Sequence, residues 1–396
     1  MKKVYLISIE AGGGHRSTVN ALQKLIAQQQ LPWEIHVVEF FKEIVGTSNP
    51  QNTYNNLILK NKWLRFIYEP ILSPLFKLEV QLRHAGWVAL LKRYWREHQP
   101  DLVVSLQPYI NQVLYESLQS VLPSVPFATL LIDLADCPPH FWIERQKQFL
   151  ICPTERAVEQ AKKLGHEENH IFQTSGVVIH PHFYEPINVN RRIERKRLGL
   201  DPDLPTGLVM FGGQGSKEML EIAQRLDKSS LDLQLIFICG HNEKVARILR
   251  YQQSRLPRLV ETFTTKIPYY MHLSDFLIGK PGPGCINEAL VMKLPVITDC
   301  NAFTLMQERY NTEWITNNQV GIVIRNFRNI DQAVAKLIQP ENLAYYQANA
   351  SAINNQGVFE VVDILARLLR SDEMLSFNQL EFMRSPSRNQ IIVQKF

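Results

Sequence analysis

The sequence lacks the features that mark several large classes of protein. Its 396 residues include no apolar run near the roughly 20 residues that a membrane-spanning helix needs. Five cysteines are widely spaced without a Cys-x-x-Cys pair, which argues against a zinc module or a disulfide framework. The net charge of +5 is too small to indicate a nucleic-acid partner. A soluble globular protein with buried thiols is the expectation that remains.

The beginning of the chain allows two interpretations. Met1-Lys2-Lys3 and the apolar run up to Ile9 resemble the start of a signal peptide. The run is short, glycines end it and no small-residue cleavage site follows, so a first strand is the better interpretation. We therefore expect a cytoplasmic protein. Its mild positive charge suits contact with an anionic membrane surface or an anionic substrate.

Strands and helices alternate along the first half of the chain. Helical periodicity covers 17–28 and 154–164, and short apolar runs between such segments are typical of buried strands. The expected strands are 4–9, 33–40, 101–105, 126–132, 149–152 and 171–175. This alternation indicates a parallel, doubly wound sheet.

The same rhythm restarts in the second half. We expect strands at 206–211, 234–239, 276–278 and 295–298, and helices at 217–226 and 243–251. The length predicts about two to three domains. The predicted division is a first Rossmann-like domain (1–177), a linker without clear period (178–193), a second Rossmann-like domain (194–358), and a C-terminal helix with its tail (359–396). The two domains would face one another across a central cleft.

The most informative segment is a loop in the second half. Lys280, Gly282, Pro283 and Gly284 lie between a short apolar run and a helical pattern. Such a junction points free backbone N–H groups and the positive end of the helix dipole at an anion, typically a phosphate. Glu288, expected in the first turn of the helix, could accept hydrogen bonds from a ribose. We infer a nucleotide diphosphate as ligand and expect a nucleotide sugar.

Gly12, Gly13 and Gly14 form another glycine-rich loop, directly after the first expected strand. His15 follows at the start of a helix, where the dipole lowers its proton affinity and favours the neutral, basic imidazole. A neutral imidazole can remove a proton from an attacking hydroxyl. A helix-capping histidine is the alternative, and the residues alone leave both open.

Two further groups could line the second wall of the cleft. One is a loop that could offer N–H groups to a phosphate or a sugar, or could be a plain turn: Gly212, Gly213, Gln214 and Gly215. The other is the pair Gln307 and Glu308, which could bind sugar hydroxyls or be a solvated surface pair.

Asp133 ends an expected strand, so it should face the cleft. It could orient His15, bind the acceptor substrate or stabilise a turn. His180 and His182 in the linker have a spacing that two metal ligands could use, but no third ligand is indicated and linker packing is the preferred interpretation. We predict no metal site and expect backbone N–H groups and a helix dipole to meet the phosphate charge.

Residues 54–99 interrupt the α/β pattern with a helical, aromatic and basic segment. Apolar side chains between Trp63 and Leu78 are interleaved with basic side chains between Lys60 and Arg83. One interpretation is a pair of core helices with solvated basic faces. The other is an interfacial element, with basic residues on lipid head groups and aromatic residues at the acyl boundary.

The motifs together resemble the GT-B glycosyltransferases of the monogalactosyldiacylglycerol synthase type, which are related to the lipid-II N-acetylglucosaminyltransferase. The match is most specific in the second half, in three segments: the glycine loop at 212–215, Lys280–Gly284 with Glu288, and Gln307-Glu308 with Asn311. In the first half, the segment 12–16 resembles the family's N-terminal loop, and Asp133-Leu134 with Phe141-Trp142 resembles another family segment. Gln107 and Ile132 depart from the usual histidine and threonine.

The resemblance implies an inverting, metal-independent hexosyltransferase that needs no cofactor besides its co-substrate. It would move galactose or glucose from a UDP-sugar to a lipid acceptor such as diacylglycerol, at the cytoplasmic face of an anionic membrane. His15 would deprotonate the acceptor hydroxyl, supported by Asp133. The N–H groups of Gly282–Gly284 would stabilise the leaving diphosphate.

Three alternatives stay open. The same fold could act on a polyprenyl, polysaccharide or small-molecule acceptor. A UDP-sugar 2-epimerase shares the architecture and would convert its substrate without any acceptor. A non-catalytic nucleotide-sugar-binding protein would bind UDP without turnover.

Overall fold

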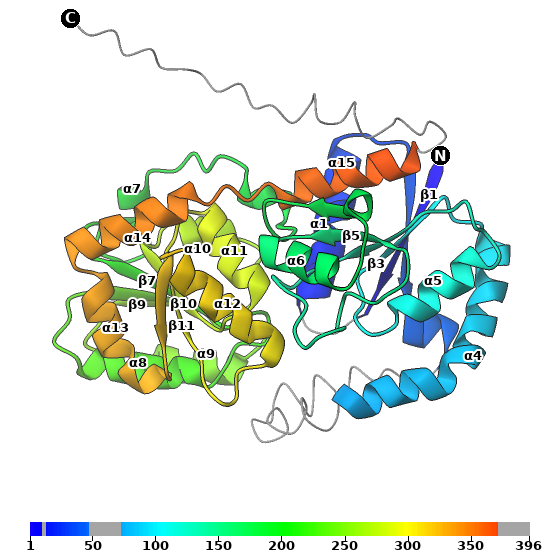
Figure 1. Ribbon diagram of the computed structural model, residues 1–396. Coiled ribbons are helices and arrows are strands. Elements are labelled where there is room, and N and C mark those ends of the chain that lie inside the picture. Colours follow the sequence, from blue (N-terminus) through cyan, green and yellow to red (C-terminus); the bar gives the residue numbers. More distant parts are fainter. Residues whose placement is uncertain (10–12, 47–72, 371–396) are drawn as a thin grey trace, which may run out of the picture.

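The computed structural model describes residues 1–9, 13–46 and 73–370, which form two lobes, each built on a parallel sheet of six strands (Figure 1). The strand order is β2-β1-β3-β4-β5-β6 in the N-terminal sheet and β12-β11-β10-β7-β8-β9 in the C-terminal sheet. In both sheets the order reverses beside the strand that opens the lobe, as in doubly wound folds. The predicted class, two Rossmann-like domains facing one another, is confirmed.

The N-terminal lobe covers both faces of its sheet with helices. Strands β3 and β4 are therefore buried along their whole length, as is typical of parallel sheets. The elements are β1 (Lys2–Ser8), α1 (Gly14–Gln28), β2 (Trp33–Glu39), the π-helical turn η1 (Phe40–Ile44), α4 (Ser73–His98), β3 (Leu102–Ser105), α5 (Asn111–Gln119), β4 (Phe127–Leu130), β5 (Phe149–Cys152), α6 (Glu155–Lys163), the 3-10 turn η4 (Glu168–His170) and β6 (Ile171–Gln173).

The C-terminal lobe repeats this organisation. Its elements are the 3-10 turn η5 (Pro181–Phe183), α7 (Arg191–Arg197), β7 (Thr206–Met210), α8 (Glu218–Lys228), β8 (Gln234–Ile238), α9 (Glu243–Tyr251), β9 (Arg258–Glu261), α10 (Ile267–His272), β10 (Phe276–Gly279), α11 (Pro283–Val291), β11 (Val296–Asp299), α12 (Met306–Asn317), β12 (Gly321–Ile324), the 3-10 turn η6 (Phe327–Asn329), α13 (Ile330–Leu337) and α14 (Pro340–Ala352).

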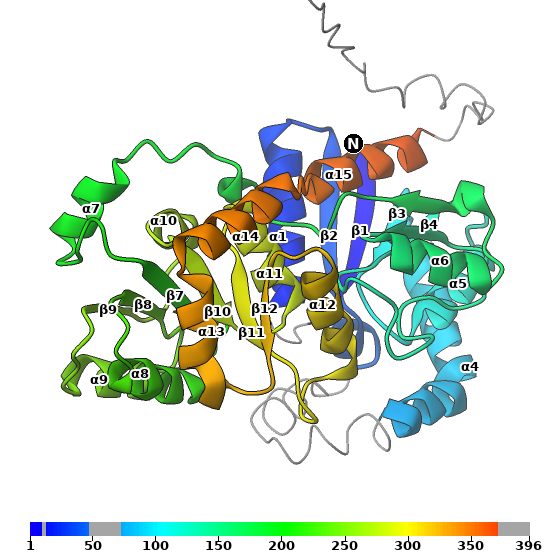
Figure 2. The same ribbon diagram turned by 60° about the vertical axis from the view of Figure 1, so that its left-hand side comes forward.

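The last helix of the described chain, α15 (Gly357–Leu369), returns to the N-terminal lobe (Figures 1 and 2). It packs against α1 and buries Val361 and Leu365 in the same core as Leu22 and Leu25. The chain therefore crosses between the lobes twice, once after β6 and once between α14 and α15. Of the C-terminal segment expected at 359–396, residues 371–396 lie outside the described residues.

The ten predicted strands are present with ends within two residues of those expected, whereas β9 and β12 were not predicted. These two lie at the edges of the C-terminal sheet and are partly exposed, so their apolar pattern is weak. The helix expected at 17–28 begins at Gly14. Of the segment expected to be helical at 54–99, residues 54–72 lie outside the described residues and the remainder forms α4.

Helix α4 packs one face against the N-terminal sheet through Trp87, Leu91 and Trp95. This agrees with a core helix on that face. Across the described residues, no helix combines the length and apolar character that crossing a membrane demands.

A cluster of charges around the buried Arg195 holds the entry into the C-terminal sheet. Arg195 on α7 is 4% exposed and donates to Asp275 at 2.8 Å and to the carbonyl of Leu273 at 2.9 Å. Asp275 also pairs with Arg191 at 2.6 Å and accepts the backbone N–H of Thr206, the first residue of β7, at 2.7 Å. Loss of one partner would leave a buried charge without compensation.

Asp275→Ala should therefore lower the free energy of unfolding by about 3–5 kcal/mol in urea denaturation. The control is Asp203→Ala, which breaks a nearby but exposed pair with Arg192 and should cost less than about 1 kcal/mol. Equal effects of the two substitutions would contradict a structural role for the cluster around Arg195.

Candidate active site

A cleft of about 2750 Å³ lies between the lobes and is lined by residues of both. The strand order reverses between β1 and β3 in one sheet and between β7 and β10 in the other. The connections that follow such strands leave towards opposite faces of the sheet, so a crevice opens at the carboxyl ends. The glycine-rich loops after β1, β7 and β10 all line this cleft.

The structure brings the predicted site residues together. Gly12 lies outside the described residues. The others all line the cleft: Gly13, Gly14, His15, Asp133, Gly212, Gly213, Gln214, Gly215, Lys280, Gly282, Pro283, Gly284, Glu288, Gln307 and Glu308. Residues far apart in the sequence thus share one cavity, while the role of each stays a prediction.

The β10–α11 turn, residues 280–284, leads directly into a helix. Gly282 is the N-cap and Pro283 the first helical residue, where the fixed φ of proline favours the helix and its missing N–H costs no intrahelical bond. The helix begins earlier than its sequence pattern suggested, so Glu288 lies in the second turn and not in the first. The N–H of Gly282 donates to the carbonyl of Lys280 at 2.8 Å, and Pro283 has no N–H, so of the predicted donors at 282–284 only Gly284 stays available to an anion. The N–H of Cys285 in the same turn also has no partner among the described residues.

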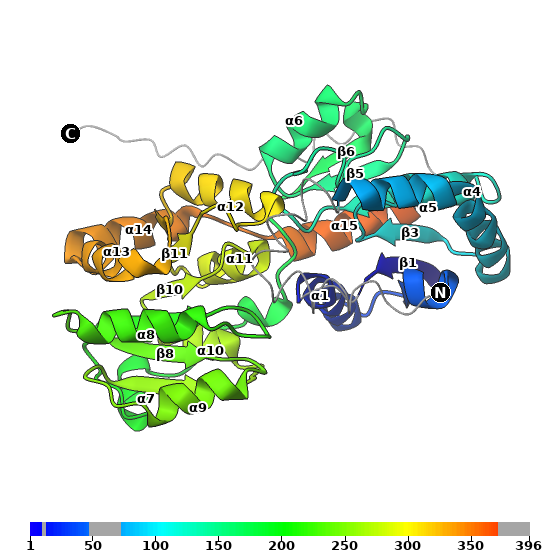
Figure 3. The ribbon, with the colours of Figure 1, turned by 90° about the horizontal axis from the view of Figure 1, so that it is seen from below.

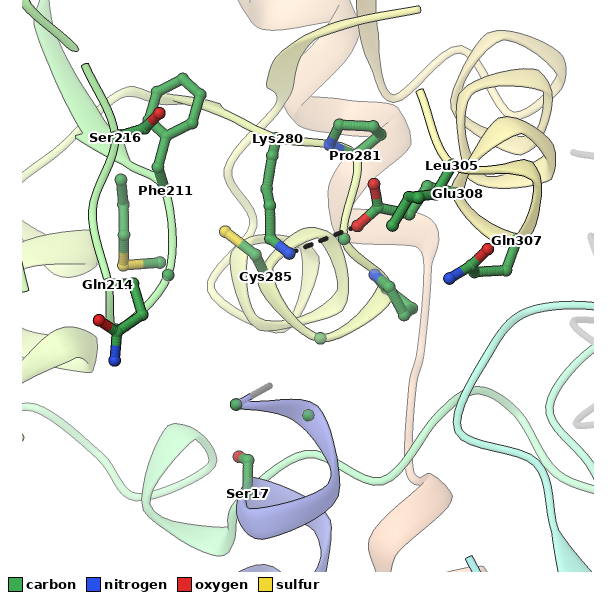
Figure 4. Close-up of a pocket in the computed structure, with 18 of the residues that line it drawn as sticks. Ser17, Phe211, Gln214, Ser216, Lys280, Pro281, Cys285, Leu305, Gln307 and Glu308 are labelled. Atoms are coloured by element: carbon green, nitrogen blue, oxygen red, sulfur yellow. Dashed lines mark hydrogen bonds and ion pairs between the residues drawn. The ribbon is translucent and has the colours of Figure 1, made fainter. Parts of the chain in front are cut away.

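Side chains of α12 support this turn. Lys280 Nζ lies 3.4 Å from Glu308 Oε1 and places a positive charge beside the turn (Figure 4). Asn311, from the predicted sugar-contacting segment, is fully buried and donates from Nδ2 to the carbonyl of Pro281 at 2.8 Å. Asn311 therefore holds the turn from behind. Ser17 on α1 lies across the cleft from Lys280 and Cys285 (Figure 4).

The loop after β7 requires glycine at two positions. Gly212 and Gly215 have φ values of 74° and 58°, a left-handed conformation that side chains disfavour. The carbonyl of Gly213 accepts the N–H of His241 at 2.8 Å, and a Cβ on Gly240 would lie 2.2 Å from that carbonyl oxygen. The loops after β7 and β8 thus pack into one wall of the cleft.

Burial raises the pKa of Glu288 to about 8. At neutral pH its carboxyl is therefore mostly protonated, and it can donate one hydrogen bond while accepting another. Such a group suits a ligand that presents neighbouring hydroxyls.

His15 is the second residue of α1, with Gly13 as the N-cap. Burial lowers the pKa of His15 to about 4, and a hydrogen bond with the backbone of Leu106 acts in the opposite direction. The helix dipole predicted the direction of this pKa shift. Its main cause is burial, which the sequence did not reveal. Within the described structure, His15 Nδ1 is buried without a hydrogen-bond partner. The site holds a neutral imidazole with one uncommitted ring nitrogen.

Asp133 is held by a tryptophan. Trp142 Nε1 donates to Asp133 Oδ2 at 3.0 Å. The ring centroids of Trp142 and His15 lie 6.2 Å apart. Among the described residues, no hydrogen bond joins Asp133 to His15, so the structure gives no direct contact by which Asp133 would orient the imidazole. Burial raises the pKa of Asp133 to about 7, opposed by the Trp142 hydrogen bond and by Lys280, and reinforced by Glu308. The charges of the opposite wall therefore act on this carboxyl.

Asp136 fixes the loop that presents Trp142. Its carboxylate accepts the backbone N–H groups of His140 at 3.0 Å and of Trp142 at 2.6 Å. Asn111 Nδ2 donates to the carbonyl of Trp142 at 3.1 Å. Because its backbone is held at several points, the loop can keep the indole aimed at Asp133.

Gln107, which departs from the family pattern, joins two strand ends at the switch point. It is 1% exposed, and its Nε2 donates to the carbonyl of Ser8 at 2.7 Å. Its backbone N–H also donates to Ser105 Oγ at 3.2 Å. The amide thus links the carboxyl ends of β1 and β3 where the loop to His15 begins.

No group of three or more His, Cys, Asp or Glu side chains in the described ranges is arranged to hold a metal ion. His180 Nδ1 accepts the backbone N–H of His182 at 3.2 Å, which is packing within the linker. The one Asp-x-Asp pattern near a strand of the C-terminal sheet, Asp201-Pro202-Asp203, precedes β7. It therefore lies at the amino end of that strand, whereas the cleft is at the carboxyl ends. Metal independence stays a prediction.

Two features of the cleft were not predicted from the sequence. One is the hydrogen bond from Trp142, because a loop tryptophan gives no sign of its partner. The other is a stack of His241 on Phe263, with ring centroids 4.3 Å apart and an interplanar angle of 11°. Both rings line the cleft, and an aromatic surface of this kind suits a planar base. The sequence signal for this stack was Phe263, an aromatic residue in a polar loop.

Two family models match the two halves of the chain. The model for monogalactosyldiacylglycerol (MGDG) synthase matches residues 15–179, and the model for the glycosyltransferase family 28 C-terminal domain matches residues 208–364. Monogalactosyldiacylglycerol synthase 1, chloroplastic, of Arabidopsis thaliana is 27% identical over 94% of this chain and 72% of that protein. The probable chloroplastic synthase of Glycine max is 27% identical over 94% of this chain and 73% of that protein.

Solved structures share the whole fold. Acinetobacter baumannii MurG has a TM-score of 0.62 at 12% identity, covering 93% of this chain and 100% of that chain. The S. aureus MnaA structure with UDP has a TM-score of 0.57 at 15% identity, covering 93% and 98%. At such identities the likeness establishes the fold alone.

Two facing doubly wound sheets and the family matches define a glycosyltransferase of the GT-B class. Within that class, the chain is similar to the monogalactosyldiacylglycerol synthases. The resemblance drawn from its glycine loops and its Lys280–Gly284 motif is therefore confirmed.

The raised pKa of Glu288 predicts a pH-dependent stability. The carboxyl ionises near pH 4.5 in the unfolded chain and near pH 8 in the folded one, so stability falls as pH rises between these values. Glu288→Gln removes this contribution and should gain stability relative to the wild type from pH 5 to pH 8. Urea denaturation at both values measures it, with exposed Glu341→Gln as the control. A difference that does not change with pH would contradict the assignment.

Proposed function

We propose that this enzyme transfers a hexose, galactose in the first place and glucose as the alternative, from a UDP-sugar to a lipid acceptor such as diacylglycerol. The observation that carries the proposal is the convergence in one cleft of the β10–α11 turn, Glu288, the pair Gln307-Glu308 and, on the facing lobe, His15. The names of the relatives support galactose and diacylglycerol, and the UDP in the MnaA structure supports a UDP donor.

The C-terminal wall would bind the donor. The free N–H groups at the start of α11 and the positive charge of Lys280 suit a diphosphate. The protonated carboxyl of Glu288 suits the ribose hydroxyls, and the His241–Phe263 stack suits the uracil ring. No metal ion is needed in this scheme, because backbone dipoles and a lysine meet the phosphate charge.

The N-terminal wall would activate the acceptor. A neutral His15 takes the proton of the acceptor hydroxyl. The hydroxyl oxygen attacks the anomeric carbon from the face opposite UDP, which inverts the configuration. The bond to the diphosphate oxygen breaks, and UDP leaves with the electron pair. The N–H groups of the β10–α11 turn stabilise the charge that develops there. Asp133, held by Trp142, faces the same space and would bind or orient the acceptor.

A lipid acceptor requires contact with a membrane, and α4 offers a surface for it. Its outer face exposes Leu75, Leu78, Leu82 and Leu90, by 53%, 48%, 78% and 45%, at helical spacing. Exposed Arg83, Arg93 and Arg96 accompany this leucine stripe, as suits an anionic membrane. Leu75 also lines the cleft, so the stripe runs to its mouth. Helix α4 lies along the lower edge of the N-terminal lobe in Figure 1.

Peripheral association with a membrane is thus part of the proposal. A cytoplasmic location, expected from the sequence, stays a prediction, and the relatives carry the word chloroplastic in their names.

The direct test is release of UDP from UDP-galactose and from UDP-glucose, with and without liposomes that contain diacylglycerol. Release that depends on the lipid, with the glycolipid as product, is the expected result. His15→Ala should reduce the rate about 10²- to 10⁴-fold while UDP binding persists. UDP binding without turnover, or conversion of the sugar without acceptor, would favour the non-catalytic or the epimerase alternative.

The leucine stripe makes a separate prediction. Leu78→Asn with Leu82→Asn should weaken binding to anionic liposomes by at least about tenfold, since each buried leucine is worth about 1.5–3 kcal/mol. UDP binding should stay unchanged. Ile193→Asn, at a residue 66% exposed on α7, is the matched control. Liposome co-sedimentation measures the effect, and unchanged binding of the double variant would assign membrane contact elsewhere.

A further inference from the structure

An uncharged hydrogen-bond network joins the β10–α11 turn to the crossings between the lobes. Asn287 on α11 is 2% exposed and donates from Nδ2 to the carbonyl of Pro283 at 2.9 Å. Its Oδ1 accepts a hydrogen bond from Asn355 Nδ2 at 3.1 Å. Asn355 lies between α14 and α15, on the second crossing. Asn355 Nδ2 also donates to the carbonyl of Val177, on the first crossing, at 3.1 Å.

The two crossings are packed against each other without spare room. Asn355 is 2% exposed, and its Oδ1 accepts the backbone N–H of Gly357 at 2.8 Å. A Cβ on Gly176 would lie 2.5 Å from the Asn355 amide, and a Cβ on Gly357 would lie 2.3 Å from the carbonyl oxygen of Gly176. The helices that follow and precede the crossing, α15 and α14, lie on different lobes (Figure 3). The Asn355 side chain is thus fixed by both crossings and by α11 together.

This arrangement restricts how the parts can move. A buried amide that loses its partner keeps the cost of desolvation without compensation. A displacement of the first turn of α11 therefore either carries Asn355 and the crossings with it or breaks the hydrogen bond between Asn287 and Asn355. The first outcome preserves all the hydrogen bonds of the network.

We propose that Asn287 and Asn355 are positioning residues that couple nucleotide binding at the β10–α11 turn to the relative orientation of the two lobes. The inference rests on the proposed function, because the ligand of the turn is taken to be a nucleoside diphosphate. Its consequence is that donor binding on one lobe helps to bring His15 on the other towards the sugar. Coupling of this kind is reciprocal, so a network that favours closure also favours donor binding.

Calorimetric titration of the full-length protein with UDP tests the coupling. Asn287→Ala and Asn355→Ala should each weaken UDP binding by at least about fivefold. The double variant should bind UDP about as tightly as the single variant with the lower affinity. Both substitutions break the same hydrogen bond between Asn287 and Asn355. Asn354→Ala is the matched control. Asn354 is the exposed neighbour, its Oδ1 accepts from Gln356 Nε2 at 3.1 Å, and the variant should bind UDP as the wild type does.

Asn287→Ser separates coupling from local support of the turn. A serine hydroxyl in a helix can donate to the carbonyl four residues earlier, here that of Pro283, but it ends too early to reach Asn355. Coupling predicts that Asn287→Ser binds UDP as weakly as Asn287→Ala. Wild-type affinity of Asn287→Ser would show that only the local bond matters and would overturn the proposal. If Asn355→Ala does not fold, as circular dichroism would show, the two variants of Asn287 decide.

The outcomes also separate this inference from the function it rests on. A wild-type protein that does not bind UDP contradicts the proposed donor, and the coupling with it. Two outcomes overturn the coupling alone, provided that the wild type binds UDP. In one, the variants bind UDP as tightly as the wild type. In the other, the losses of affinity in the two single variants multiply in the double variant.

Discussion

The reversal of strand order in each parallel sheet is the constraint on which the rest of the structure depends. Between β1 and β3, and again between β7 and β10, the connecting chains leave on opposite faces and open a crevice at the carboxyl ends. In the proposed function, backbone N–H groups at helix starts would provide the phosphate contacts. The two crevices face one another because α15 returns to the N-terminal lobe and packs on α1.

Burial determines the chemistry of the cleft more than local sequence does. It lowers the pKa of His15 to about 4 and raises those of Asp133 and Glu288 to about 7 and about 8. All three groups therefore tend towards their uncharged forms near neutral pH. Beside the turn, Lys280 forms an ion pair with Glu308 at 3.4 Å. In the proposed function, Lys280 and the start of α11 would meet the charge of the diphosphate.

The sequence predicted the parts of the fold that rest on strong local patterns. Buried runs such as 149–152 and the glycine loops at Gly13 and Gly212 have unambiguous signals, and the structure places them where parallel topology requires. Edge strands β9 and β12 were missed because partial exposure weakens their pattern. The helix start at Pro283 was misplaced because a proline and glycines were taken as loop only. Contacts such as Trp142 to Asp133 and Asn355 to Asn287 join distant segments, and no single-sequence pattern records them.

A crystal structure of the protein with UDP would test the central claim most directly. The diphosphate should lie against the N–H groups of the β10–α11 turn beside Lys280, with the ribose hydroxyls on Glu288 and the cleft open towards His15. A nucleotide bound outside this cleft, or bound within it with its phosphates away from the start of α11, would contradict the assignment of the donor wall.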